Sequence, residues 1–146
     1  MSIASGTSIV GRLISYSQAV SGGSTSTNTT ANGPVTLTAA QMLSGFIDCN
    51  GAQGGGFNYV TDTAAAILTA MQALVLGAGA TSGITVGQKF TFTIFNDGTG
   101  QTGTLTGGTN VTISAPTTTV ATTAARTFTY IVTAVGATPT GRVVGA

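Results

Sequence analysis

The sequence predicts an all-β body, a jelly-roll-like sandwich or barrel with one short helix packed on it, and an extended N-terminal arm. Two observations carry this prediction. The chain of 146 residues contains 22 Gly, and Thr is frequent while charged residues are scarce; Thr suits half-exposed strands and Gly supplies the turns between them. Short segments with alternating apolar residues also recur about every ten residues, which is typical of sandwiches and barrels.

The charge is unusually low. Lys and Arg total 4, Asp and Glu total 3, and there is no His, which leaves a net charge of +1. Charged residues make up 5% of the chain, against about 25% in an ordinary soluble domain. Without a basic patch, nucleic acid is not an expected partner. Two interpretations of the uncharged surface stay open: copies of the chain or another protein cover it, or Thr, Ser, Asn and Gln hydrate it alone.

The first 33 residues are expected to form an arm and linker, and residues 34–146 the body. The stretch "SGGSTSTNTTANG" at 21–33 contains no core-forming residue and is typical of a linker. Before it lies an apolar group that could form a strand and that we expect to contact a partner or a neighbouring subunit: Ile9, Val10, Leu13, Ile14 and Tyr16. The alternative is a disordered terminus. The start lacks the features of a signal peptide.

One helix is predicted at residues 63–76. Its apolar positions recur at helical spacing and comprise Ala64, Ile67, Leu68, Met71, Leu74 and Val75. Thr61, Asp62 and Thr63 offer N-caps, and Gly77 stands where a C-terminal glycine belongs. The helix has no charged residue, so it is expected to be covered on most sides. Earlier in the body, "PVTLT" and "GFIDCN" are expected strands, "AAQML" a helical turn capped by Thr38, and residues 50–58 a glycine loop.

The stretch "VLGAGATSG" at 75–83 resembles a dinucleotide-binding fingerprint, but its context is wrong. In nucleotide folds the glycines follow a strand and open a helix, whose positive end receives the pyrophosphate. Here they follow the predicted helix and lie at its negative end. We therefore interpret Gly77 to Gly83 as a helix cap and a loop, and expect no nucleotide cofactor.

The second half of the body is dominated by predicted strands. In "QKFTFTIFN", Phe90, Phe92 and Ile94 share one face, as Phe128, Tyr130 and Val132 do in "RTFTYIVTAV". These six residues are expected to line one core with the 67–71 helix face. Asp97 and Gly98 in "NDGTGQ" predict a hairpin turn into a partner strand, "TGTLTGG". "TNVTISA" is another expected strand, and "GRVVGA" is expected to close a sheet edge.

Catalysis is not expected. A chain without His cannot form a Ser–His–Asp triad, and its single lysine does not lie in a Walker A loop. Asp62 and Asp97 have structural interpretations as cap and turn, and Asp48 has no obvious partner. Cys49 is alone, which excludes an internal disulfide and a cysteine-based metal site, and we expect it to be a buried thiol. No metal or cofactor is therefore predicted.

Binding of sugars through aromatic rings has little support either. The chain has no Trp, and Phe57 and Tyr59, beside the glycine loop, are the exposed-looking pair. Packing is their expected role. No segment reaches the roughly 18 to 20 apolar residues that cross a bilayer, so no membrane contact is predicted.

Five segments, taken in order, resemble a family of small tailed-phage virion proteins, the capsid decoration (cement) or head-fibre proteins. They are "TLTAAQMLSGFID", "TDTAAAILTAM", "VGQKFTFTIFNDG", "GTLTGGTNVTIS" and "RTFTYIVTAV", and they span about residues 34–135. The resemblance implies a β-rich body that forms a homotrimer on the outer surface of a virion. Its implied partners are copies of itself and the major capsid protein of a phage shell.

The resemblance predicts a non-enzymatic function: a decoration protein that binds the phage head shell and stabilises it. A head- or tail-fibre domain that binds a receptor is the alternative that the resemblance leaves open. A secreted adhesin would need a signal peptide, and an enzyme would need residues that the sequence lacks.

Overall fold

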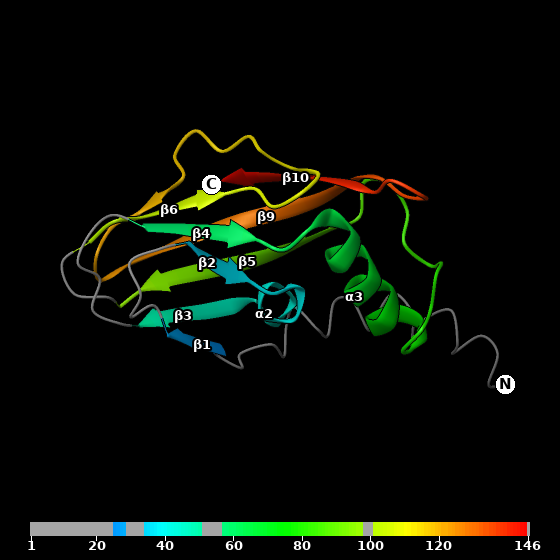
Figure 1. Cartoon of the computed structure of the whole chain (residues 1–146), viewed down its shortest axis with the longest axis horizontal. Helices are drawn as coiled ribbons and strands as arrows, with labels where there is room; N and C mark the ends of the chain where they lie inside the picture. Colours follow the sequence, from blue (N-terminus) through cyan, green and yellow to red (C-terminus); the bar gives the residue numbers. More distant parts are fainter. Residues whose placement is uncertain (1–24, 29–33, 51–56, 98–100, 146) are drawn as a thin grey trace, which may run out of the picture.

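The structure, a computed structural model, describes residues 25–28, 34–50, 57–97 and 101–145 (Figure 1). These residues form two mixed β-sheets and two helices. The first sheet has the strand order β1 (Thr25–Asn28), β3 (Phe46–Asn50), β5 (Lys89–Asn96), β9 (Ala124–Ala134), β10 (Thr140–Gly145) and β7 (Val111–Ile113). The second has the order β2 (Val35–Leu37), β4 (Phe57–Thr61), β6 (Gly103–Thr106) and β8 (Thr119–Val120). The prediction of a β-rich body is confirmed.

The helices are α2 (Ala39–Ser44) and α3 (Ala64–Leu76), and both begin at predicted caps. The Thr38 hydroxyl accepts a hydrogen bond from the N–H of Gln41, whose side chain accepts one from the N–H of Thr38, so α2 has a complete capping box. Thr63 caps α3 by accepting from the N–H of Ala66. Gly77 ends α3 with φ of 97°, a value that suits glycine. The glycines of "VLGAGATSG" therefore do follow a helix.

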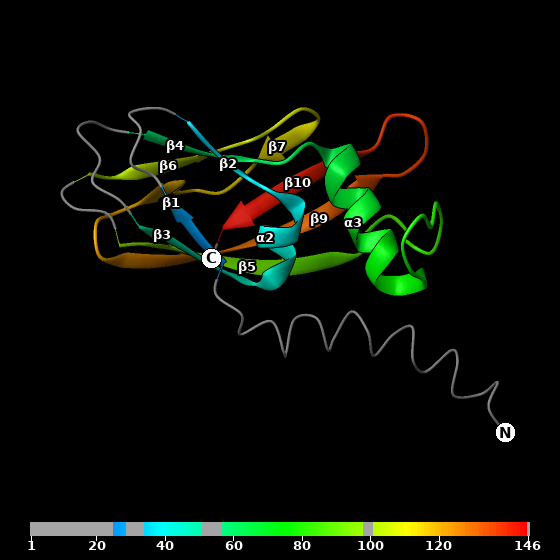
Figure 2. The same cartoon turned by 60° about the horizontal axis from the view of Figure 1, so that its bottom comes forward.

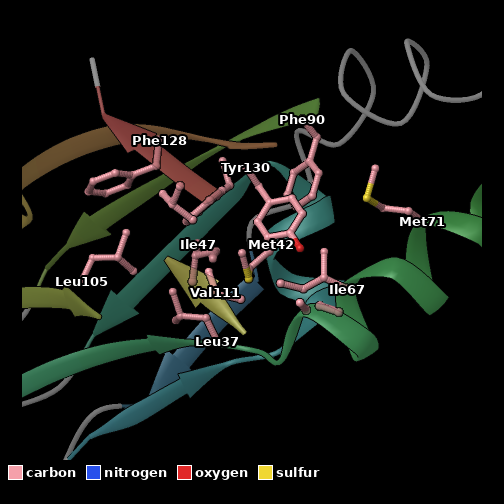
Figure 3. Packing of buried hydrophobic residues seen from close by; sticks show 14 of the residues in the cluster. Leu37, Met42, Ile47, Ile67, Met71, Phe90, Leu105, Val111, Phe128 and Tyr130 are labelled. Carbon is pink, nitrogen blue, oxygen red and sulfur yellow. The ribbon is translucent and has the colours of Figure 1, made fainter. Parts of the chain in front are cut away.

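The two sheets and the two helices share one buried core. Figures 1 and 2 show the four-stranded sheet over one half of the six-stranded sheet, and α2 and α3 beside it over the other half. The six residues predicted to face the core from β5 and β9 are all buried, as are Ile67, Leu68 and Met71 of α3. In Figure 3, Tyr130 and Phe90 lie beside Met42 and Ile67, while Phe128 lies nearer Leu105 of the second sheet. The predicted core is confirmed.

Strand pairing differs from the sequence prediction in two places. The turn signal at Asp97 does not lead into a hairpin, because β5 pairs with β3 and β9 while β6 belongs to the other sheet. The last strand, β10, is not an edge strand, because it lies between β9 and β7. Both predictions were wrong because alternation shows which face a side chain occupies but not which strand lies beside it.

Three strands were not predicted. β4 occupies the end of the expected glycine loop, β8 is a two-residue strand, and β1 lies within the expected linker, where it pairs in parallel with β3. A polar strand such as β1 offers no apolar pattern to detect, because its main contribution is backbone hydrogen bonding at a sheet edge.

Helix α3, which we expected to be covered on most sides, is exposed along part of its surface. Leu74 is 40% exposed and Leu76 is 52% exposed, whereas the polar Gln72 is buried. Successive helical residues are about 100° apart, so Leu74 and Gln72 occupy opposite borders of the buried arc centred on Ile67, Leu68, Met71 and Val75. The core receives the Gln72 border, and the Leu74 border faces outward.

Candidate binding surfaces

The six-stranded sheet has an outer face rich in hydroxyl groups. Side chains alternate along a strand, so the residues between the core positions point away from the second sheet. They are Lys89, Thr91, Thr93 and Phe95 of β5, Thr127, Thr129, Ile131 and Thr133 of β9, and Thr140, Arg142 and Val144 of β10. The strand register places Thr93 opposite Thr127, with the two hydroxyl oxygens 2.8 Å apart.

A groove of about 510 Å³ lies at the β7 side of this face. Its lining comes from the turn before β7 and from β7, β9 and β10: Asn110, Val111, Thr112, Thr133, Thr140, Gly141 and Arg142. The backbone joins these segments, since the N–H of Gly141 donates to the carbonyl oxygen of Asn110 at 3.0 Å. Asn110 has φ of 62°, a left-handed conformation that asparagine adopts more readily than most residues.

A β-bulge shapes the groove. Thr140 pairs with Ala134 and Gly141 with Val132, so Thr133 is an extra residue in β9. The Thr133 and Thr140 hydroxyl oxygens lie 2.7 Å apart. Bulges commonly redirect a side chain next to a binding site, and here the bulge brings two hydroxyl groups together at one wall of the groove.

Four large apolar residues are exposed in the described part of the chain, Leu74, Leu76, Val86 and Val135, and we call the segments that carry them the apolar end. Figures 1 and 2 show the C-terminal end of α3, the loop that follows it and the β9–β10 turn at the same end of the molecule. The backbone joins the last two segments, because the N–H of Gly87 donates to the carbonyl oxygen of Val132. No charged residue occurs in the sequence between 63 and 88 or between 127 and 141. Hydration of this end therefore rests on hydroxyl, amide and backbone groups and not on charge.

The opposite side of the outer face carries an aromatic pair. Phe46 and Phe95 stack with ring centroids 6.4 Å apart, and both are half-buried. Asp48 is in register with Phe95 across β3 and β5. Within the described part of the chain, the buried Oδ1 atom of Asp48 has no hydrogen-bond partner.

Asp62 has a structural role, as predicted, but it serves two helices. Its Oδ1 accepts from the N–H of Thr63 at 2.8 Å and its Oδ2 accepts from the N–H of Ala39 at 2.9 Å. One carboxylate therefore lies at the N-terminal ends of both α2 and α3, where negative charge is favourable. The N-cap of α3 itself is Thr63.

Cys49 is a buried thiol, as predicted. Burial raises its pKa to about 12; the nearby Asp48 charge also raises it, while a hydrogen bond with Tyr59 lowers it. Burial likewise raises the pKa of Tyr59, and raises that of Tyr130 to about 12. At neutral pH these groups are protonated and enclosed, so they form parts of the core.

The residues predicted to contact a partner lie outside the described residues, as does the glycine loop at 51–56; they are Ile9, Val10, Leu13, Ile14 and Tyr16. Tyr59 is fully buried, which confirms its packing role. The groove and the apolar end were not predicted. For the groove, the sequence offered one signal, Arg142, which is a rare charged residue in an alternating strand.

Within residues 25–28, 34–50, 57–97 and 101–145, no group of three or more His, Cys, Asp or Glu could hold a metal ion. Neither described helix is long and apolar enough to span a bilayer. No family model, curated protein or solved structure matches this chain.

Proposed function

We propose that this chain is a non-enzymatic structural protein of a phage virion, a capsid decoration protein that binds the head shell as a homotrimer and stabilises it. The observation that carries the proposal is the apolar end. Val86 is 60% exposed and Leu76 is 52% exposed, and both lie between residues 63 and 88, a segment that contains no charged residue. Burial of apolar surface is worth about 25 cal/mol per Å², so contact with another protein would be favourable here.

The chemistry of the described polar groups supports binding rather than catalysis. Asp62 is engaged with two helix ends, and Cys49 and Tyr130 are enclosed in the core. A catalytic base or nucleophile needs a group that substrate can reach and whose pKa suits the reaction. The raised pKa values of Cys49 and Tyr130 move them away from that range.

The proposal includes the way in which the two sheets pack. We infer a sandwich of the two sheets, because their core residues belong to one buried cluster. The parallel pairs β3–β5 and β4–β6 depart from the antiparallel pairing of the expected jelly roll. In this proposal the apolar residues at 9–16 contact a neighbouring subunit or the major capsid protein.

Shell binding tests the function directly. Phage heads assembled without this protein are mixed with the full chain and sedimented, and their resistance to osmotic shock is then measured. The full chain should co-sediment and raise the surviving fraction. Leu76→Lys should weaken both effects by placing a charge in the apolar end, whereas Thr69→Lys adds the same charge at another exposed position of α3. Failure of the unmodified chain to bind at any molar excess would contradict the proposal.

A receptor-binding domain of a head or tail fibre is the second candidate. The groove beside Arg142 favours it, because it combines a cation with several hydroxyl groups on an exposed face. Both candidates place the chain on the virion surface.

A further inference from the structure

The groove contains a cation that the rest of the described chain does not neutralise. Arg142 is exposed, and its guanidinium forms no hydrogen bond or ion pair with another described residue. Thr112 lies directly opposite it on β7, and Ile131 lies on its other side on β9. An arginine in this position presents five N–H donors in a planar fork, which matches a carboxylate.

The remaining polar groups of the groove suit a ligand with several hydroxyl groups. The hydroxyl groups of Thr133 and Thr140 use one hydrogen between them for their mutual bond, so the pair keeps one donor and free acceptor positions. Thr112 adds a third hydroxyl and Asn110 adds an amide. Hydroxyl groups can donate and accept, as those of a sugar do.

We propose that this groove binds an acidic sugar of a cell-surface polysaccharide, with the sugar carboxylate on Arg142 and its hydroxyl groups on Thr112, Thr133 and Thr140. A polyphosphate chain fits less well, because affinity for such chains comes from many cationic contacts. An apolar ligand would leave the threonine hydroxyl groups and the guanidinium without partners, which is costly.

The size of the groove agrees with this ligand class. Small-molecule sites typically measure about 300–1,000 Å³, and this groove measures about 510 Å³. Few ionic contacts and an exposed site predict weak affinity, with a Kd on the order of 1 mM for a single sugar. The inference goes beyond the decoration role, and it would supply the receptor contact on which the fibre alternative rests.

The test is a titration of the ¹⁵N-labelled full chain, followed by NMR. The probes are glucuronic acid and glucose, which differ only at C6, where the first has a carboxylate and the second a hydroxymethyl group. Glucuronic acid should shift the amides of Thr112, Gly141 and Arg142, and glucose should bind roughly tenfold more weakly or worse. Arg142→Gln should remove this preference, whereas Arg126→Gln changes an arginine of β9 that does not line the groove and should leave it intact.

A second variant distinguishes binding of the sugar from binding of a simple anion. Thr133→Val removes one hydroxyl from the groove with little change in side-chain volume, so it should weaken glucuronic acid binding while leaving acetate binding unchanged. If Arg142→Gln does not fold, Thr133→Val and the acetate comparison still test the site. Shell binding and oligomeric mass should not respond to either variant, so failure here is distinct from failure of the decoration role.

Three results would overturn the inference. The first is that glucuronic acid causes no amide shifts in the groove at concentrations well above about 1 mM, the Kd expected for one sugar. The second is equal binding of acetate and glucuronic acid, which would show that the sugar hydroxyl groups contribute nothing. The third is tighter, Arg142-dependent binding of polyglutamate than of oligoglucuronate, which would assign the groove to a protein carboxylate.

Discussion

The ring of Tyr130 on β9 lies across Gly141 on the neighbouring strand β10, where a methyl group would overlap the phenol. The other sheet repeats the arrangement, because the ring of Tyr59 occupies the space beside Gly103. In each case the glycine is needed for close approach of the ring. Both tyrosines are among the largest fully enclosed side chains of the core, so these pairs help to determine how tightly each sheet packs.

Gly141→Ala should therefore destabilise the protein. Overpacking a well-filled core typically costs about 1–3 kcal/mol, and we expect the free energy of unfolding to fall by that amount in chemical denaturation. In a Tyr130→Leu background, where the space is vacated, Gly141→Ala should cost much less. An unchanged denaturation midpoint for Gly141→Ala would show that the ring moves aside freely.

The stability should fall at alkaline pH. Burial raises the pKa of Tyr130 from 10.0 to about 12, so above pH 10 the folded chain binds more protons than the unfolded chain. The contribution of this group is complete below pH 10 and is lost as the pH rises toward 12. Urea denaturation at about pH 8 and about pH 11 measures the difference, and Tyr130→Phe, which cannot ionise, should reduce it. If the Tyr130→Phe variant loses the same stability between these two pH values, Tyr130 does not contribute to the pH dependence.

Asp62 should be the most important aspartate for stability. Asp62→Ala removes hydrogen bonds to Thr63 and Ala39 at two helix ends, and loss of a helix cap costs typically about 1 kcal/mol, with a range of about 0.5–2. Asp97→Ala removes the same charge from an exposed position and serves as the control. Thermal denaturation should show a lower midpoint for Asp62→Ala alone; equal midpoints for the two variants would contradict the double-capping role.

Thr123 should be replaceable with a gain in stability. Its φ of 56° is in the left-handed region, which a β-branched residue disfavours and asparagine tolerates. Thr123→Asn should raise the free energy of unfolding by about 0.5–1 kcal/mol, although the hydrogen bond from its hydroxyl to the Thr122 carbonyl oxygen is lost. Thr123→Ser keeps that hydroxyl and is the control. A lower stability for the Asn variant would show that the hydroxyl outweighs the backbone strain.

Much of the fold could be predicted from local sequence. Alternation in β5 and β9 identified the core face, and Thr38 and Thr63 identified the starts of both helices, because each signal acts within a few residues. Strand order could not be obtained in this way. The Asp97 turn resembles a hairpin locally, and only the packing of the whole chain sends β6 to the other sheet.

The candidate surfaces were less predictable still. The groove combines residues near 110, 133 and 141, which meet because β10 lies between β9 and β7 and because a bulge redirects Thr133. The apolar end depends on the rotation of α3, which buries Gln72 and exposes Leu74. A helix that is apolar on nearly all sides contains no signal for that choice.

The most direct measurement is the mass of the full chain in solution by light scattering, beside the Leu74→Lys, Leu76→Lys double variant. If the apolar end is a contact between copies, the unmodified chain should have a mass near three times 14.2 kDa, and the double variant should fall toward a single chain. A monomeric unmodified chain, or a double variant with unchanged mass, would contradict self-association through this surface.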